Sequence, residues 1–517
     1  MKNSIKTCLG FILIGTFSMA YAQNGPGEPN GRSTSSIDLQ NMEYIGSVDE
    51  RYQSYNIEMC EVIGGDFWVP YQKLDSVMKH SDKKGFEALK WEIPPIDLKE
   101  KKLRNLAAAL GPAYIRVSGT WANDVYFQNN DSPILEEAPN GFNNVLTREQ
   151  WKGVVDFSKA VNGKIVTSFA ISAGMYDANG AYQVDQVKDL IDYTKSIGGE
   201  ISAAEMFNEP TFASHGSAPE GYNAQSYADD FTVFHDFVSE YYPEMKVVGP
   251  GSVGEGGVLE TGGVVNIDIA TEDLMAKLPK NPFEAYTYHF YGGVSKRCGG
   301  KQTLESVMTQ EWLSKTEKGL EFYQKSRDKY NPEAPIWLNE TAEAACGGDP
   351  LAATYADTFR YLEQLGRLAK KGVQVVMHNT LARSEYALLE HDTHDPRPNY
   401  WAALLWGKLM GTQVYDANNL APGVNVYVHN KKGGSVGRTA LIINATKSDY
   451  FFEIPNKAKQ YLLTADSLDT KTVHLNGKAL KLNSDDSLPN ISGERIEAGD
   501  VRIPSHGILF LSFDGSN

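Results

Sequence analysis

The sequence predicts a (β/α)8 barrel followed by an antiparallel β-sandwich. Between about residues 55 and 378, eight short β-rich runs alternate with segments in which apolar residues recur every three or four positions. After about residue 410 this helical period disappears, and short β-branched or aromatic runs are separated by Asn, Gly, Asp and Lys turns. At 517 residues the chain exceeds the size of one ordinary core, so two domains are expected.

The eight candidate strands and the helical segments between them occur in alternating order. The strands are residues 55–59, 113–117, 164–170, 202–207, 245–249, 284–290, 335–339 and 373–378. The helical segments include residues 98–110, 148–161, 186–197, 227–242, 304–326 and 355–372. This order predicts a closed barrel, whose functional residues lie at the C-terminal ends of the strands. An open doubly wound sheet is the alternative, but no glycine-rich nucleotide loop follows the first strand.

The first 22 residues have the pattern of a secretory signal. Lys2 and Lys6 precede an apolar run that ends in Ala-Tyr-Ala, so cleavage after Ala22 is expected. The mature protein is therefore expected to be secreted or periplasmic. No later run reaches the roughly 18 apolar residues that a membrane-spanning helix needs.

The rest of the chain divides into three expected parts after a disordered start. Residues 23–35 are rich in Gly, Pro, Asn and Ser and are expected to be disordered. Residues 54–411 form the predicted catalytic barrel, and residues 412–517 form the predicted sandwich. Residues 36–53 precede the first barrel strand and are expected to add an edge to that sandwich.

The net charge excludes one class of partner. The chain carries a formal charge of −16, and loss of Lys2 and Lys6 with the signal would leave −18. A chain this acidic is a poor general binder of polyanions, so no nucleic-acid partner is expected. Any recognition of an acidic ligand must come from a local pocket.

Asn-Glu pairs close two of the candidate strands. The fourth strand is followed by Asn208, Glu209 and Pro210, and the seventh ends at Asn339 and Glu340. Strands three apart in an eight-stranded ring face each other across its mouth, so the two carboxylates are expected to meet over one substrate. This is the two-carboxylate arrangement of glycoside hydrolysis. A solvated loop glutamate is the plainer interpretation of either pair taken alone.

Side chains near other strand ends extend this candidate site. Arg116 on the second strand could orient Glu340 and keep it ionised. His289 and Tyr291 on the sixth strand lie two residues apart and share a face, and the tyrosine hydroxyl could hydrogen-bond the nucleophile. Taken singly, each such residue is more often a structural polar residue with its hydrogen bonds satisfied. Glu343, three residues after Glu340, is expected to be a surface acid.

Seven sequence blocks resemble the heparanase and β-glucuronidase family, glycoside hydrolase family 79. The resemblance runs from about Tyr55 to Ala417, with the blocks in the same order. They are GPAYIRVSGT, FNEP, TYHFY, IWLNETAEAACGGDP, VQVVMHNT, SEYALLEHD and DPRPNYWAALLWGKLMGT. The resemblance implies a barrel plus β-sandwich, no metal or organic cofactor, and retaining hydrolysis of β-D-glucuronic acid linkages in a uronic-acid-containing glycan.

The resemblance also implies roles for the matching residues. Glu209 would be the acid/base and Glu340 the nucleophile. Asn208 would contact the sugar 2-hydroxyl, and Tyr291 would hold the nucleophile. For this division of roles the pKa of Glu209 must be raised while Glu340 stays ionised.

The uronate carboxylate would be held by three residues that we call the anion clamp: Cys346, Gly347 and Tyr386. Heparanases carry Tyr-Gly-Gly-Gly where this chain has Ala345-Cys346-Gly347-Gly348, so the first clamp amide belongs to a cysteine. A non-proline amide still donates there, provided that the backbone does not require positive φ. The basic insertion by which heparanase grips sulfated chains is replaced by the acidic NNDSPILEEAPNG, which favours a less sulfated glucuronide.

Two further functions stay open at this point. A retaining barrel hydrolase for neutral β-glycosides would share both glutamates and differ in the clamp. A non-catalytic secreted carbohydrate-binding protein would be suggested by loss of either glutamate, and both are present. Endo versus exo action depends on the loops around the mouth of the barrel.

Three cysteines remain after the expected cleavage. Cys298 and Cys346 lie in the loops after the sixth and seventh strands, where neighbouring loops could bring them within bridging distance. Cys60, at the end of the first strand, would then be the odd thiol. Three unrelated thiols are the equal alternative.

Overall fold

The structure is a computed structural model that describes residues 35–515, except residues 38, 40–41, 81, 257–265 and 435. The expected signal peptide lies outside the described residues. So does the segment expected to be disordered, apart from Ser35, which begins a short strand.

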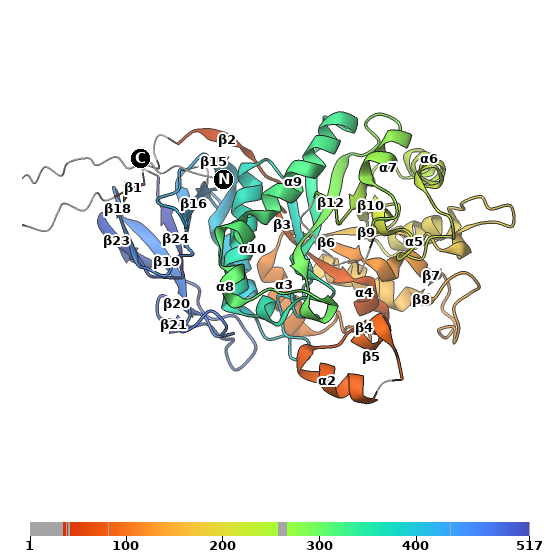
Figure 1. The fold of residues 1–517 in the computed structure, drawn as a ribbon, viewed down its shortest axis with the longest axis horizontal. Helices are drawn as coiled ribbons and strands as arrows, with labels where there is room; N and C mark the ends of the chain where they lie inside the picture. The colour runs from red at the N-terminus through yellow and green to blue at the C-terminus, as the bar shows by residue number, and fades with distance from the viewer. Residues whose placement is uncertain are drawn as a thin grey trace, which may run out of the picture.

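Eight parallel strands close into a barrel, which confirms the predicted fold class. In chain order they are β3 (Gln53–Glu58), β6 (Ala113–Ser118), β9 (Gly163–Ser168), β10 (Ile201–Glu205), β11 (Lys246–Ser252), β12 (Ala285–Val294), β13 (Ile336–Ala345) and β14 (Val375–His378). Each strand pairs with the next, and β14 closes the ring against β3. The strands are buried along almost their whole length because helices cover their outer faces (Figure 1).

The helices that follow the strands form the outer layer of the barrel. They are α3 (Lys101–Leu110), α4 (Arg148–Ala160), α5 (Asp185–Ser196), α6 (Ala224–Tyr241), α7 (Thr271–Lys277), α9 (Gln310–Tyr330), α10 (Tyr355–Lys370) and α11 (Pro398–Leu409), with the short α8 (Leu304–Val307) before α9. Local signals set several starts: Thr147 and Gln150 form a capping box at α4, and Asn223 caps α6. Almost every side chain of α10 is buried, because α10 packs against the barrel, against α9 and α11, and against the C-terminal β domain.

A second, antiparallel β domain packs beside the barrel. Its larger sheet contains β2 (Tyr44–Ser47), β15 (Met410–Tyr415), β16 (Val424–Lys431), β17 (Arg438–Asn444), β24 (Gly507–Phe513), β19 (Ala458–Thr464), β20 (His474–Leu475), β21 (Lys478–Ala479) and β22 (Glu494–Ile496). Its smaller sheet contains β1 (Ser35–Ser36), β18 (Tyr450–Ile454) and β23 (Gly499–Ile503). A separate apolar core fills the domain, with Val426, Ile442, Phe452 and Leu509 among its buried members.

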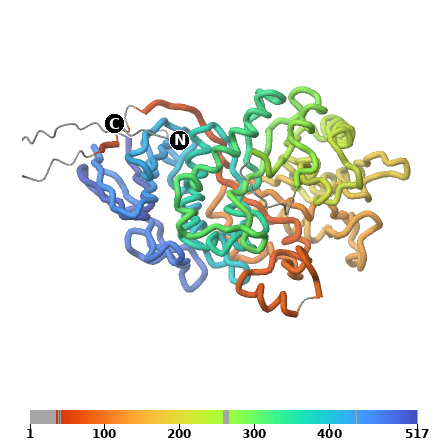
Figure 2. Tube along the Cα trace, viewed as in Figure 1, coloured from red at the N-terminus to blue at the C-terminus, as the bar shows by residue number. Residues whose placement is uncertain are grey.

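The N-terminal strands join this second domain before the chain enters the barrel. Strand β2 pairs antiparallel with β15, and β1 pairs parallel with β18. Figure 2 shows the red N-terminal segment running along the blue C-terminal region.

Two small excursions decorate the barrel. After β3 and the short α1 (Met59–Ile63), the hairpin of β4 (Gly65–Trp68) and β5 (Lys90–Ile93) encloses α2 (Tyr71–His80) and a 3-10 turn, Gly85–Leu89. After β6, a turn (Thr120–Asp124) leads to β7 (Val125–Gln128), which pairs with β8 (Asn144–Thr147). Both excursions start at the C-terminal ends of barrel strands, so they wall the mouth of the barrel.

Candidate active site

A cavity of about 420 Å³ opens at the C-terminal ends of the barrel strands. Its lining includes Glu209, Glu340, Tyr291, Cys346 and Tyr386, which the sequence predicts as site residues. The structure therefore brings both predicted carboxylates and part of the anion clamp to one space.

Glu340 reaches the barrel interior because β13 carries a bulge. Two residues of β13, Asn339 and Glu340, stand opposite the single His289 of β12. The bulge turns both side chains inward: Asn339 Nδ2 donates to Glu205 Oε1 at 2.8 Å, and Glu340 accepts from Arg116. The sequence indicated that Glu340 lies at the end of this strand. In the structure β13 continues to Ala345, so Glu340 lies within a paired strand.

Arg116 is the centre of a buried polar network below the cavity. Its side chain is 1% exposed, and its Nη1 donates to Glu340 Oε2 at 2.7 Å. Its Nη2 donates to Glu205 Oε2 at 2.9 Å and to Asn208 Oδ1 at 2.7 Å. Because a guanidinium only donates, it holds the Asn208 amide with its oxygen inward and its NH2 group directed away. This places Arg116 where the sequence predicted it, beside Glu340.

Glu209 is presented by a backbone turn in the left-handed region. Its φ is 54° and its ψ is 62°, a conformation that costs a side-chain-bearing residue about 1 to 2 kcal/mol. Asn123 helps to hold the turn, because its side chain accepts from the Asn208 N–H at 2.9 Å and donates to the Asn208 carbonyl at 2.9 Å. Strain of this kind is typical of functional sites whose surroundings fix the geometry.

His289 lies between the two carboxyl groups. Its Nδ1 is 2.9 Å from Glu209 Oε1 and 3.7 Å from Glu340 Oε2. Its Nε2 faces Arg116 Nη2 at 3.3 Å, and a guanidinium has no acceptor. Nδ1 therefore carries a proton, which it donates to Glu209.

The surroundings push the two carboxyl groups in opposite directions. Burial raises the pKa of Glu209, the charge of Glu340 raises it further, and the hydrogen bond from His289 offsets only part of this rise. Burial also opposes ionisation of Glu340, but the neighbouring His289 and Arg116 and the hydrogen bond from Tyr291 outweigh it, so its pKa is lowered. Two carboxyl groups with separated pKa values suit one acid and one anion.

Tyr291 and Tyr386 supply hydroxyl donors on two sides of the cavity. Tyr291 donates to Glu340 Oε1 at 2.6 Å, as predicted. Burial raises the pKa of both tyrosines well above the usual value, so both hydroxyls stay protonated. Their rings lie 6.4 Å apart between centroids, and the Asn379 amide contacts both hydroxyls, at 3.1 Å and 3.2 Å.

The backbone of the anion clamp turns through three successive residues with positive φ: 65° at Cys346, 76° at Gly347 and 84° at Gly348. Within the described residues, no hydrogen bond uses their three N–H groups. Cys346 and Tyr386 line the cavity, whereas Gly347 packs under the Trp68 ring, where a Cβ would lie 2.4 Å from Trp68 Cγ. Successive free amides in a turn make an anion-binding concavity.

Glu205, Glu58 and Asn379 also belong to the site and were not predicted from the sequence. Glu205, at the end of β10, accepts from Arg116, Asn339 and Thr287. Glu58, at the end of β3, lines the cavity, and Asn379 donates to its Oε1 at 2.8 Å. Burial and the charge of Glu340 raise the pKa of Glu58 to about 8. A signal was available for Glu58, which lies next to the end of the first predicted strand, but not for Glu205, which lies inside the fourth predicted strand and ends the strand only in the structure.

The prediction that Glu343 is a surface acid is wrong. Its side chain faces outward from β13 but is only 2% exposed, because helices cover the outer faces of the barrel strands. Its Oε1 accepts from the Asp349 N–H at 2.7 Å. Burial, together with the charges of Asp357 and Asp349, raises its pKa well above the usual value. Glu343 therefore supports the loop that carries the clamp.

The cysteines are arranged as the bridge hypothesis requires. Cys298 and Cys346 form a disulfide with a Cα–Cα distance of 6.5 Å, and Cys60 is a buried free thiol. The bridge joins the loop after β12 to the loop after β13, beside the cavity.

Glu209, His289 and Glu340 are also the residues that could hold a metal ion, since one ligand atom from each lies within 4.8 Å of the others. Both oxygens of Glu340 are already engaged, one by Tyr291 and one by Arg116. A cation at this point would lie beside the Arg116 guanidinium. The residues thus fit a polar substrate better than a divalent ion.

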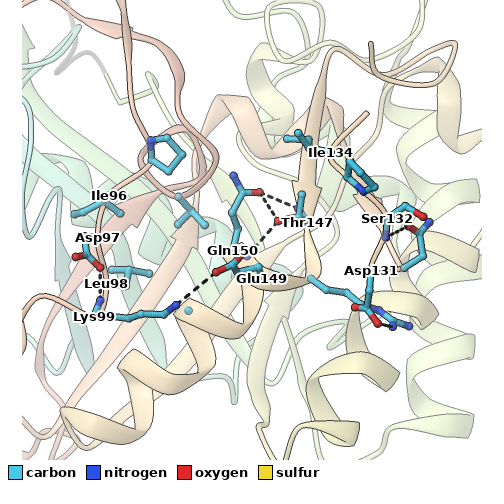
Figure 3. Close-up of a pocket in the computed structure, with 16 residues that line it drawn as sticks. Ile96, Asp97, Leu98, Lys99, Asp131, Ser132, Ile134, Thr147, Glu149 and Gln150 are labelled. Atoms are coloured by element: carbon cyan, nitrogen blue, oxygen red, sulfur yellow. Dashed lines mark hydrogen bonds and ion pairs between the residues drawn. The ribbon is translucent and has the colours of Figure 1, made fainter. Parts of the chain in front are cut away.

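A larger cavity, of about 780 Å³, lies away from these carboxylates, between the β5–α3 loop, the loop after β7 and the start of α4. Figure 3 shows that Lys99 and Glu149 face each other there, 3.5 Å apart. Asp131 pairs with Arg148 at 3.4 Å. We place the active site in the smaller cavity, because convergent ionisable groups with shifted pKa values mark functional sites better than volume does.

A closed (β/α)8 barrel with two facing carboxyl groups at its mouth defines the class of barrel glycoside hydrolases. Residues 74–366 match the family described as glycosyl hydrolase family 79, N-terminal domain. The match covers more than half of the chain, and the protein belongs to glycosyl hydrolase family 79. A carbohydrate substrate is implied by this membership.

Individual relatives agree with this assignment. The chain is 26% identical over 471 residues to heparanase-like protein 1 of Arabidopsis thaliana, covering 79% of this chain and 84% of the relative. It is 26% identical over 468 residues to a hyaluronoglucuronidase of Hirudo nipponia, covering 81% and 91%. In structure it is similar to a 4-O-α-L-rhamnosyl-β-D-glucuronidase of Fusarium oxysporum, with a TM-score of 0.63, 13% identity, and 92% and 100% coverage. Among the described residues, no helix is long and apolar enough to cross a membrane.

Proposed function

We propose that this protein is a retaining glycoside hydrolase that cleaves β-D-glucuronic acid linkages, with Glu340 as nucleophile and Glu209 as acid/base. One observation carries the mechanism: carboxylate oxygens of the two residues lie within 4.8 Å of each other in environments that shift their pKa values apart. Retaining enzymes hold their carboxyl groups about 5 to 5.5 Å apart, whereas inverting enzymes need about 6.5 to 9.5 Å to admit a water.

The hydrogen bonds of Glu340 and the raised pKa of Glu209 fit the two roles that a double displacement needs. Arg116 and Tyr291 occupy the two oxygens of Glu340 and keep it ionised for attack on the anomeric carbon. As Glu340 attacks, protonated Glu209 gives its proton to the leaving oxygen, so the bond from the anomeric carbon to that oxygen breaks and a glycosyl-enzyme ester forms at Glu340. Glu209 then removes a proton from water, whose oxygen attacks the anomeric carbon. The bond from that carbon to Glu340 breaks, so the sugar is released, Glu340 returns to a carboxylate and Glu209 is again protonated.

The substrate class is supported by the anion clamp. Cys346 and Tyr386 both line the cavity, and the free N–H of the one and the protonated hydroxyl of the other are neutral donors for a carboxylate. Such donors suit an acidic protein that recognises a uronate. The acidic loop in place of a basic insertion favours a less sulfated glucuronide, and two relatives are named as a hyaluronoglucuronidase and a baicalin-β-D-glucuronidase.

Separate variants test the two roles. Glu340→Ala should abolish turnover on every substrate. Glu209→Ala should slow glycosides with poor leaving groups by about 10²- to 10⁴-fold, spare the first step for aryl glycosides with good leaving groups, and be rescued by azide. Equal losses without rescue would contradict the roles. NMR of the first-formed product should show the β anomer, and an α anomer would contradict retention.

A pair of aryl glycosides tests the substrate. An aryl β-D-glucuronide should turn over at least ~100-fold better in kcat/KM than the matching β-D-glucoside, a difference of roughly 2.7 kcal/mol. Tyr386→Phe should narrow this gap, mainly by slowing the glucuronide. Comparable rates in the unaltered enzyme would favour a hydrolase for neutral β-glycosides, and no turnover with intact sugar binding would favour a carbohydrate-binding protein.

We further propose that the protein acts outside the cytoplasm. The signal-like first 22 residues and the Cys298–Cys346 disulfide support this location, because disulfides persist in oxidising compartments. N-terminal sequencing of the protein from its native host should begin at Gln23.

A further inference from the structure

The disulfide is attached to the residue that supplies the first clamp amide. Cys346 follows β13 directly and lines the cavity, while Cys298 ends the short turn Lys296–Cys298 after β12. The two strands pair up to Val294 and Ala345, and the Ser295 N–H donates to the Ala345 carbonyl at 2.9 Å. The bridge therefore begins where the strand pairing ends.

Cys346 adopts a backbone conformation that its side chain disfavours. Its φ of 65° lies in the left-handed region, where glycine carries no steric penalty and other residues do. The next two residues, Gly347 and Gly348, also have positive φ and need no compensation. Some contact must hold Cys346 in this conformation.

Hydrogen bonds fix the rest of the loop but not Cys346. The Gly347 carbonyl accepts from the Glu385 N–H at 3.0 Å, and the Gly348 carbonyl accepts from Ser295 Oγ at 2.6 Å. Lys296 pairs with Asp349, whose N–H donates to Glu343. Within the described part of the chain, no hydrogen bond reaches the backbone of Cys346.

Cys346 also packs against the apolar cluster that contains Phe67 and Trp68, and the disulfide adds a covalent link to the neighbouring loop. We propose that the Cys298–Cys346 bridge is a specificity-determining device: it holds Cys346 in the left-handed conformation that keeps its N–H in the anion clamp. The proposal rests on the proposed glucuronide specificity. Loss of the bridge should weaken recognition of the carboxylate without disturbing Glu340, which Arg116 and Tyr291 hold separately.

Three variants test the bridge. In Cys298→Ser the Cys346 backbone is free to leave positive φ, so KM for an aryl β-D-glucuronide should rise about 10-fold, the loss of roughly one charge-assisted hydrogen bond, with kcat within about twofold. The kcat/KM for the matching β-D-glucoside should stay unchanged. The double variant Cys298→Ser with Cys346→Gly should restore the glucuronide KM, because glycine accepts positive φ without a bridge. Cys298→Ser with Cys346→Ala is the matched control and should not restore it.

Reduction of the folded wild-type enzyme gives the same test without a substitution. A dithiol transfers two electrons and two protons to the bridge, leaving two thiols and the oxidised dithiol, and thiol titration confirms the change. Reduced enzyme should lose glucuronide affinity as Cys298→Ser does, while the Cys298→Ser, Cys346→Gly variant should not respond to the dithiol.

The outcomes separate this inference from the proposed function. An unaltered enzyme without preference for the glucuronide would defeat the proposed function, and the clamp role with it. If the unaltered enzyme prefers the glucuronide, but the glucuronide KM stays the same after both Cys298→Ser and reduction, only the proposed role of the bridge would be overturned. Equal losses on both substrates, with no rescue by Cys346→Gly, would assign the bridge to general stability and also overturn the inference.

Discussion

The barrel interior has two layers of opposite chemistry. An apolar layer fills its N-terminal half and consists of Tyr114, Val166, Ala203, Val248, Ala285, Trp337, Val375 and Met377. A polar layer lies above it, two residues further along four of the same strands. The successive pairs are Tyr114 and Arg116, Ala203 and Glu205, Ala285 and Thr287, and Trp337 and Asn339. Side chains two residues apart on a strand face the same way, so the change is one of residue type and not of direction.

The difference between the two layers shows that the barrel uses one set of inward-facing residues for packing and another for the polar site. The apolar layer contributes burial, and none of its eight members lines the cavity. In the polar layer the guanidinium of Arg116 forms salt bridges with both Glu205 and Glu340, so the loss of any one of these three residues removes a charged partner of another. His289 and Arg116 together lower the pKa of Glu340 against the effect of its burial. Burial raises the pKa of Glu58 and of Glu209, neither of which contacts the guanidinium.

Arg116→Gln should break the polar layer and give the largest effect. Removal of the shared donor leaves two buried carboxylates without their cation, which costs about 3 to 5 kcal/mol of folding free energy. The pKa of Glu340 should rise, so kcat/KM at neutral pH should fall by at least ~100-fold. Urea unfolding and steady-state kinetics measure both effects. Near-native stability with retained activity would show that the layer does not depend on the guanidinium.

The alternation of strands and helices was enough to predict the barrel. The rule that function lies at strand ends selected Glu209, Glu340 and Arg116, which the structure brings together, and their roles stay predictions. The bulge at Asn339 was not predictable, because nothing in PIWLNE reports an extra residue that turns two successive side chains inward. Glu58 lies next to the end of the first predicted strand and was overlooked, although the same rule applied to it.

Two other differences have physical causes. Glu343 was expected at the surface because it is charged, but a barrel strand is covered on its outer face as well as its inner one. Loop adjacency made the Cys298–Cys346 bridge conceivable, whereas the positive φ of Cys346 depends on the geometry of the loop in space. Residue types and spacing therefore indicated which groups meet, and packing determined how they are held.

Glu58→Gln should change how the stability of the protein depends on pH, because Glu58 is a buried carboxyl group with a raised pKa. The pKa of Glu58 is raised to about 8 by burial and by the charge of Glu340, against about 4.5 in the unfolded chain. Between these pH values only the unfolded chain releases the proton, so wild-type stability falls as pH rises from about 4.5 to about 8. Glutamine cannot ionise, so the free energy of unfolding of the variant should rise relative to that of the wild type over this pH range, by several kcal/mol in order of magnitude. Chemical denaturation at pH 5 and pH 8.5 measures the difference, and a pH-independent difference would contradict a buried neutral Glu58.

Tyr291→Phe should weaken the polar layer without breaking it. It removes the 2.6 Å hydrogen bond to Glu340 Oε1, which favours the ionised nucleophile. The pKa of Glu340 should rise, so the acidic limb of the kcat/KM profile should move to higher pH and kcat/KM should fall roughly 30-fold, or about 2 kcal/mol. Tyr386→Phe is the matched control: it should change the glucuronide kinetics and leave the acidic limb in place. A common shift of that limb in both variants would mean that neither tyrosine acts on Glu340 specifically.

Val166→Ala tests the apolar layer and should give the smallest effect. Val166 is fully buried on β9, a strand that supplies no predicted catalytic side chain. Removal of its two methyl groups should cost roughly 1.5 kcal/mol of folding free energy, with some addition for the cavity that remains. Below the unfolding transition, kcat/KM and its pH profile should match the wild type, and Val248→Ala on β11 should behave alike. A shifted pH profile in either variant would break the comparison, because it would mean that packing in the lower half of the barrel positions the carboxylates above it.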